Sequence, residues 1–323
     1  GHGSEVRISK GYMSLAIEMG DERPQVLNAL AQIEDQLEYW IIATIYTRAR
    51  TAPPIIGMVS HKPYNPFGPP QPGRFRDFEQ ALQRAFGTAA RTYLTLDEPV
   101  AEDVDVLVVA APRDLKPEQV YHLEQFLLRG GRGILLLDPV DIDNVLGRAA
   151  QQAEPHTSGL EDWLAHLGVT VEKGVVGDFA SDCLFPRGGE YVRYPYWPTL
   201  LPENMDQGNP VTRNLLPMPM YWPAAVTVDD ARQEAEGRTA TVLVATTEAG
   251  YRRPDIKALG RANESPDGKL KENVPVIVLL EGPTKSFWLG KPVPGEEPAV
   301  PEDGSAPGGD NGSEGAPGGS PEG

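Results

Sequence analysis

Polar side chains that could take part in chemistry follow three apolar segments of the chain. They are Ser60, His61, Arg113, Asp114, Asp138 and Asp141. If the three segments end side by side, these residues and Lys62 bring an imidazole, two cations and several carboxylates together. Such a mixture suits the binding of a polar ligand or acid–base catalysis. A simpler interpretation also stays open, in which Asp114 and Asp138 cap turns and Arg113 pairs with them.

Alternating strand and helix patterns position these residues. Short apolar strands are predicted at 53–60, 90–97, 104–112 and 133–140, with amphipathic helices at 75–87 and 117–131. The middle strands lack polar alternation, which is typical of a parallel sheet covered by helices on both faces. We therefore predict an α/β fold, an open, mostly parallel, doubly wound sheet of flavodoxin-like type with β-rich additions. In such sheets ligands bind beyond the carboxyl ends of the strands, where the six residues lie.

The rest of the chain divides by composition. The predicted parts are 1–4, a cloning remnant; 5–52, a strand-turn-strand and an amphipathic helix; 53–178, the α/β core; 179–290, an aromatic and Pro-rich segment with C-terminal strands; and 291–323, an acidic linker. Within the core, 169–178 is predicted as a fifth strand and Ser158-x-x-Glu161 as a helix-capping box. The linker is rich in Pro and Gly and too poor in apolar residues to offset its ordering entropy, so disorder is predicted there.

Aromatic residues gather in the segment after 179. They are Tyr194, Tyr196, Trp197, Tyr221 and Trp222, together with Tyr191. Aromatic rings beside prolines can form a stacking surface for a sugar or a peptide, or an anchor at an interface. They can equally pack an irregular lobe onto a core. A glycan-binding surface requires exposed, coplanar rings, so burial of these residues would exclude it.

Several function classes lack their sequence signals. The formal net charge of −17 argues against nucleic-acid binding, which needs clustered Lys and Arg. No nucleophile elbow, no phosphate-binding loop and no metal-ligand spacing occurs among the histidines. Cys183 is the single cysteine, which excludes an intramolecular disulfide, and no apolar stretch is long enough to span a bilayer. We therefore predict no enzymatic activity, no cofactor and no metal.

At 104–140 the sequence VDVLVVAAPRDLKPEQVYHLEQFLLRGGRGILLLDPV resembles the gliding-motility-type (GldG-like) auxiliary proteins of ABC transporters. The shared pattern is a strand ending in Pro, a helix, a Gly-Gly turn and a strand ending in Leu-Asp-Pro. Flanking pieces occur in the same order, among them GYMSLAIEMGDE, LEYWIIATIY, GNPVTRNL and VPVIVLLEGPTKSF. The similarity spans roughly residues 10 to 295.

This resemblance implies an extracytoplasmic (periplasmic) domain of a bacterial inner-membrane protein. Its partners would be an ABC permease and ATPase, and its sheet would be similar to class I glutamine amidotransferases without their catalytic cysteine. Membrane helices and a final strand of the family are not in this sequence, which indicates a fragment. The expected function is non-enzymatic binding or coupling. The alternatives are an enzyme acting on a polar cell-envelope substrate through His61 and a strand-end carboxylate, and a glycan-binding module.

Overall fold

A four-stranded parallel sheet forms the centre of the computed structural model. The structure describes residues 13–18, 23–28, 37–38, 41–42, 44–45, 54–60, 75–143, 152–180, 184–187, 189–256, 259 and 271–295. The strands of the sheet are β3 (Ile56–Val59), β4 (Ala90–Leu94), β5 (Val106–Ala110) and β6 (Arg132–Leu136). Their order is β4-β3-β5-β6, and every neighbouring pair is parallel. The chain thus moves to one side of β3 first and then to the other.

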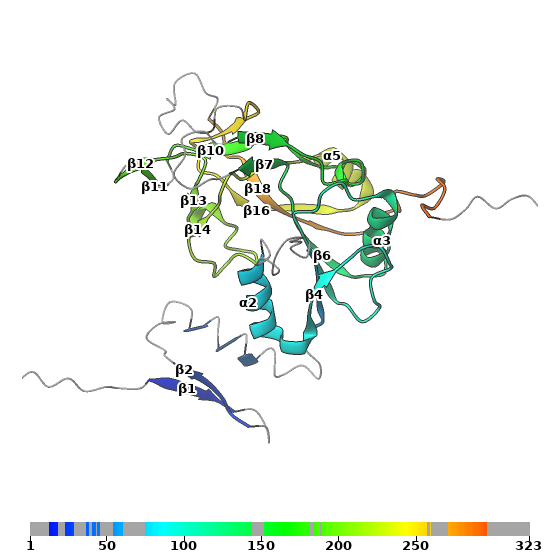
Figure 1. Cartoon of the computed structure of the whole chain (residues 1–323), viewed down its shortest axis with the longest axis horizontal. Coiled ribbons are helices and arrows are strands. Elements are labelled where there is room, and N and C mark those ends of the chain that lie inside the picture. The colour runs from blue at the N-terminus through cyan, green and yellow to red at the C-terminus, as the bar shows by residue number, and fades with distance from the viewer. Residues whose placement is uncertain are drawn as a thin grey trace, which may run out of the picture.

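Helices cover both faces of this sheet, as its apolar strands predict. Helix α2 (Arg76–Phe86) lies on one face, and α3 (Pro117–Leu128) and α4 (Glu161–His166) lie on the other. Helix α5 (Asp230–Glu236) lies apart from this sheet, and single 3₁₀ turns occur at η3 (Gly87–Ala89) and η4 (Pro202–Asn204). Met58 and Val108 pack under α2, whereas Leu107 and Val109 face α3 and α4. Figure 1 shows α2 and α3 on opposite sides of β4 and β6. Strand β4 leads to β5 without a helix, which agrees with the short connection in the sequence.

The ends of the two long helices follow their sequence signals. Pro117 occupies the first turn of α3, where its missing N–H costs no hydrogen bond, and Lys116 N–H donates to Gln119 Oε1 at 2.9 Å. Beyond α3, Gly130 has φ 97°, a conformation that glycine adopts without strain. Helix α2 ends in the same way at Gly87, with φ 59°.

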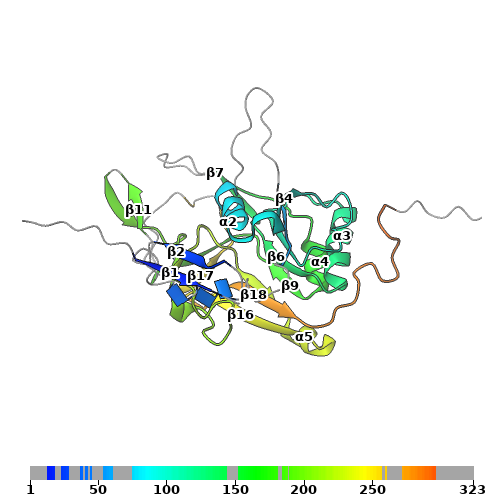
Figure 2. The same cartoon turned by 90° about the horizontal axis from the view of Figure 1, so that it is seen from below.

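The remaining strands form antiparallel pairs. The pairs are β1 (Ser14–Ile17) with β2 (Gln25–Asn28), β7 (Val140–Asp143) with β8 (Gln152–Pro155), β9 (Val169–Val171) with β15 (Val226–Val228), β10 (Val175–Asp178) with β17 (Gly250–Arg253), β11 (Leu184–Arg187) with β12 (Glu190–Arg193), β13 (Thr199–Leu200) with β14 (Met218–Pro219), and β16 (Thr239–Ala245) with β18 (Pro275–Glu281). Figure 2 shows β16, β18 and α5 along the side of the molecule away from α2.

One strand prediction is wrong. Residues 169–178 do not form a fifth parallel strand but two short strands, β9 and β10, which pair with β15 and β17. The break lies at Gly174, where a Cβ atom would come within 2.6 Å of the Arg253 carbonyl oxygen. The chain can pass the Arg253 backbone here only because residue 174 is a glycine. The fold is therefore mixed α/β with a four-stranded parallel sheet and β-rich additions, and the flavodoxin-like type stays a prediction.

Candidate functional site

The carboxyl ends of β3 and β5 lie side by side in the sheet, and the chain leaves them in opposite directions. From β3 it passes through α2 to β4, and from β5 it passes through α3 to β6. Open α/β sheets bind their ligands at such a divergence. Of the residues predicted there, Ser60 follows β3 and Arg113 and Asp114 follow β5. We call the polar residues at this edge the strand-end surface and describe them in turn.

Ser60 belongs to a polar cluster that the sequence did not reveal. Its Oγ donates a hydrogen bond to Glu79 Oε1 at 3.0 Å, and the Tyr93 hydroxyl donates to Glu79 Oε2 at 2.6 Å. Ser60 and Glu79 are both buried. The hydrogen bond to the carboxylate holds the phenolic proton and raises the pKa of Tyr93. Both carboxylate oxygens of Glu79 therefore have a donor, and Ser60 is already engaged.

A β-bulge in β4 brings Tyr93 to this cluster. The register between β3 and β4 shifts between Gly57 and Val59, and Tyr93 has φ 62°, which is a rare conformation for an aromatic residue. Bulges often redirect a side chain beside a functional site. Because Glu79 lies on α2 and Ser60 at the end of β3, the cluster ties three elements together at the strand-end surface.

The loop between β5 and α3 is held in a strained conformation. Ala111 has φ 43° and Asp114 has φ 48°. Asp114 N–H donates to the Thr157 carbonyl at 3.1 Å, the Thr157 hydroxyl donates to Asp114 Oδ1, and Leu115 N–H donates to the Ser158 carbonyl at 3.0 Å. A left-handed conformation costs a non-glycine residue about 1–2 kcal/mol, so these bonds must offset it.

Substitution of Ala111 by glycine tests this strain. Glycine removes the left-handed penalty but adds about 0.5–1 kcal/mol of unfolded-state entropy, so we expect Ala111→Gly to leave the free energy of unfolding unchanged or to raise it by up to about 1 kcal/mol. The control Ala101→Gly, in an exposed turn without positive φ, should lower it by about 0.5 kcal/mol. Urea denaturation measures both. A loss at Ala111 equal to that at Ala101 would contradict the strain.

Arg113 and Asp141 meet at the rim of the strand-end surface. Arg113 Nη2 lies 3.1 Å from Asp141 Oδ2, and their side chains are 33% and 48% exposed. Asp141 lies on β7, beyond the end of β6, so the pair joins the loop after β5 to the β7–β8 hairpin. That the predicted strand ends form one site stays a prediction. An ion pair with that exposure contributes little to stability, about 0–1 kcal/mol. Breaking the Arg113–Asp141 ion pair to bind a partner would therefore cost little free energy.

Asp138 lines a small pocket beyond β6. The pocket has a volume of about 50 Å³, and Ser158, Glu161 and Lys173 also line it. Burial by itself would raise the pKa of Glu161, but the hydrogen bonds from the Ser158 and Gly159 backbone N–H groups outweigh it and lower the pKa. The predicted capping contact of Ser158 with Glu161 is therefore present. Small-molecule sites usually measure roughly 300–1,000 Å³, so this pocket holds no substrate of that size.

Other predicted residues lie elsewhere. His61 and Cys183 fall outside the described residues, so the proximity of His61 to a carboxylate stays a prediction. The aromatic surface is wrong for Tyr194 and Tyr196, because both are buried in the core around β10 and β17. The rings of Trp197 and Trp222 meet the ring of Tyr194 edge-on, at interplanar angles of 83° and 81°. The rings therefore pack against one another, and only Tyr221 of the five is mainly exposed, at 61%.

A second group of polar side chains holds the segment that follows β18. Residues 284–291, which we call the strap, lie against α3 and α4. Ser286 Oγ donates to Glu124 Oε2 at 2.7 Å, and Phe287 N–H donates to Glu124 Oε1 at 2.5 Å. The Trp288 ring packs edge-on against Tyr121, 5.6 Å away. Glu124 is 2% exposed, and the pattern of α3 alone predicts only its apolar face.

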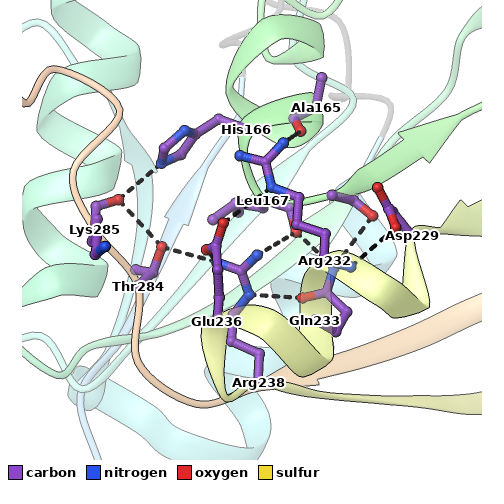
Figure 3. A network of polar contacts seen from close by, with 11 residues as sticks. Ala165, His166, Leu167, Asp229, Arg232, Gln233, Glu236, Arg238, Thr284 and Lys285 are labelled. Atoms are coloured by element: carbon purple, nitrogen blue, oxygen red, sulfur yellow. Dashed lines mark hydrogen bonds and ion pairs between the residues drawn. The ribbon is translucent and has the colours of Figure 1, made fainter.

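The start of the strap also joins a network around Arg238, shown in Figure 3. The Arg238 guanidinium donates to Gln233 Oε1 at 2.7 Å and to the Leu167 carbonyl at 3.0 Å, pairs with Glu236 at 2.6 Å, and contacts Thr284 Oγ1 at 3.4 Å. His166 Nε2 lies 2.9 Å from the Lys285 carbonyl. The strap is thus held by Arg238, which follows α5, and by α4 at one end, and by α3 at the other.

Two further observations concern metals and membranes. Within the described part of the chain, no group of three or more His, Cys, Asp or Glu side chains is arranged to hold a metal ion. In that same part, none of the helices combines the length and the apolar character needed to cross a membrane.

Comparison with known proteins identifies the family. The profile of the family described as "ABC-type uncharacterized transport system" matches residues 53–315, most of the chain. Comparisons with curated proteins and with solved structures found no match. The match includes the parallel sheet, the strand-end surface and the strap. The chain therefore belongs to this family, whose name marks it as an auxiliary component of an ABC-type transport system.

Proposed function

We propose that the chain is a non-enzymatic coupling domain, held outside the cytoplasm, that contacts the permease of its ABC transport system. The observation that carries the proposal is the position of α3. This helix begins three residues after the strained Asp114, and Glu124 on the same helix receives the strap. One rigid element therefore joins the strand-end surface to the strap that follows β18.

The geometry of α3 suits the transmission of a displacement. Glu124 lies seven residues beyond Pro117, which corresponds to about 10 Å along a helix. Strap residues after β18 lead directly to the acidic residues 296–323 of the sequence. A pull on that linker would act on Glu124, and through α3 on the loop that carries Arg113. A rigid secondary element that contacts both sites is one of the structures that carry coupling between them.

The strand-end side chains favour binding over catalysis. Ser60 donates to Glu79, Arg113 pairs with Asp141, and Asp114 is bonded to Thr157. A nucleophile would instead need a base within hydrogen-bond reach and a site for the reacting atom. The enzyme alternative therefore depends on His61. The partners proposed for the exposed Arg113–Asp141 pair are polar loops of the permease, with the ATPase in the same assembly and a GldG-like role for the chain.

The test is co-purification of the intact, membrane-anchored protein in mild detergent, with partners identified by mass spectrometry. We expect a stoichiometric permease and ATPase, and at least fivefold less permease with Arg113→Glu. The matched control is Arg91→Glu, which breaks the exposed Arg91–Asp103 pair and should leave recovery unchanged. An equal loss of permease in both variants would show that the strand-end surface is not the contact with the permease. Recovery of the protein alone, under conditions that keep other transporters assembled, would overturn the proposal and favour the enzyme alternative.

A further inference from the structure

The loop between β13 and β14 turns apolar side chains toward the solvent. Val211, Leu215 and Leu216 are 58%, 42% and 45% exposed, and Leu201 is 39% exposed. The last residue pair of the hairpin precedes Leu201, so Leu201 and Leu216 lie near each other at the base of the loop. The loop includes GNPVTRNL at 208–215, one of the pieces that carry the family resemblance, and the proposed function gives this piece no role.

A turn at 209–215 brings these side chains together. Arg213 N–H donates to the Asn209 carbonyl at 2.9 Å, and Leu215 N–H donates to the Thr212 carbonyl at 3.1 Å. Residues four apart lie on the same side of such a helical turn, so Val211 and Leu215 are neighbours. Exposed apolar side chains that gather in one place, unlike single ones, mark an interaction site. We call this group the loop patch; its members are Leu201, Val211, Leu215 and Leu216.

The polar side chains of the loop point inward instead. Thr212 is 2% exposed, and its hydroxyl donates to the Asp206 carbonyl at 2.7 Å. Asn209 Oδ1 accepts from Val211 N–H at 3.0 Å, and Asp206 N–H donates to the Leu243 carbonyl on β16 at 2.9 Å. These bonds fix the backbone of the loop to itself and to β16. The loop patch is therefore presented to the solvent by a fixed backbone.

The charge around the loop patch shows what kind of partner it fits. The chain has 46 Asp and Glu residues among 323, yet residues 207–228 contain none. Arg213 is the single charged residue of that range, and its side chain makes no ion pair with another described residue. Leucines beside one cation, without a carboxylate, suit the surface of a phospholipid bilayer. Apolar side chains enter the acyl boundary there, and an arginine extends its charged end to the phosphate groups.

We propose that the loop patch inserts into the surface of the phospholipid bilayer that holds the permease, with Arg213 at the phosphate groups. The inference rests on the proposed function for the presence of a bilayer beside the domain. It adds a lipid contact to the protein contact at the strand-end surface. Two contacts of different kinds would fix the orientation of the domain on its transporter.

Flotation of the full chain with phosphatidylcholine vesicles tests the insertion. These vesicles have no net charge, so they do not repel a chain of net charge −17. We expect the chain to float with the vesicles at millimolar lipid, and Leu216→Glu to lower the partition coefficient by about tenfold or more. The matched control is Leu289→Glu, which changes a strap leucine that is 74% exposed and should leave the partition coefficient unchanged. Figure 1 shows β13 and β14 on the opposite side of the molecule from the strap.

A fluorescent label gives a second measurement that does not depend on a destabilising substitution. In a Cys183→Ser background, an environment-sensitive dye on Leu215→Cys should shift its emission to the blue when vesicles are added, whereas the same dye on Leu289→Cys should not. The absence of both flotation and this shift would overturn the proposal, as would equal losses of flotation in Leu216→Glu and Leu289→Glu.

The two proposals can fail separately. Loss of permease co-purification in Leu216→Glu, without vesicle binding by the unaltered chain, would assign the loop patch to a protein partner and overturn the lipid contact. The vesicles contain no permease, so recovery of the protein alone in co-purification would overturn the proposed function and leave the vesicle result in place.

Discussion

Replacement of Glu124 by alanine is expected to lower the free energy of unfolding by about 2–3 kcal/mol. The substitution removes the acceptor of Ser286 Oγ–H and Phe287 N–H, which are half-buried, and a donor left without a partner costs up to about 1–3 kcal/mol, the value for a fully buried group. The folded protein also no longer bears the cost of burying the Glu124 carboxylate. The summed cost of the two lost hydrogen bonds is therefore an upper limit on the destabilisation. Thermal denaturation should show a midpoint lower by about 4–10 °C.

The control for this prediction lies on the same helix. Glu118 is exposed in the first turn of α3, so Glu118→Ala should cost at most about 1 kcal/mol through its interaction with the helix dipole. Hydrogen exchange at residues 284–291 adds a local measurement. It should accelerate strongly in Glu124→Ala and stay unchanged in Glu118→Ala. Equal midpoints and equal exchange in the two variants would show that Glu124 does not hold the strap.

Arg238→Met is expected to be the other strongly destabilising substitution, by about 3 kcal/mol. The Arg238 side chain is 1% exposed, and its loss leaves the Leu167 carbonyl and Gln233 Oε1 without this donor. Removing one partner of a buried ion pair costs about 3–5 kcal/mol, and the partial exposure of Glu236 places the expected loss at the lower end. Methionine keeps an unbranched side chain of similar width but is shorter than arginine, so the loss includes some packing of the guanidinium as well as its polar contacts.

Arg232 offers the matched control because it pairs with the same carboxylate. Its side chain is 35% exposed, and Arg232 Nε lies 3.1 Å from Glu236 Oε1. Such exposed pairs contribute about 0.2–1 kcal/mol, so Arg232→Met should cost no more than about 1 kcal/mol. Guanidinium denaturation of both variants measures the difference. Similar losses would mean that burial of Arg238 adds nothing to its contacts.

Local sequence signals predicted the elements around the strand-end surface. Pro117 marked the start of α3, Gly87 and Gly130 the ends of α2 and α3, and apolar runs the parallel strands. These signals work because each depends on backbone geometry within a few residues. The rule about the ends of parallel strands drew attention to Arg113, but the ion pair of Arg113 with Asp141 on β7 lies outside what that rule predicts.

Contacts between distant segments could not be predicted in this way. The partners of Glu79 depend on a bulge in β4, and those of Glu124 lie in a segment beyond the last strand. The split of 169–178 depends on a close approach of Gly174 to the backbone after β17. Burial of Tyr194 and Tyr196 carried no periodic signal, because the neighbouring prolines interrupt any regular pattern. Tertiary packing decides all of these features.

The strap also determines when the fold can be completed during synthesis. Ser286 and Phe287 follow Glu124 by 162 and 163 residues. At a translation rate of about 5–20 residues per second, α3 emerges from the ribosome roughly 8–30 s before its partners. Throughout that interval the Glu124 carboxylate is hydrated and the apolar side chains of Tyr121 and its neighbours are uncovered. Helix α3 therefore obtains its full set of contacts only after β18 and the strap have been made.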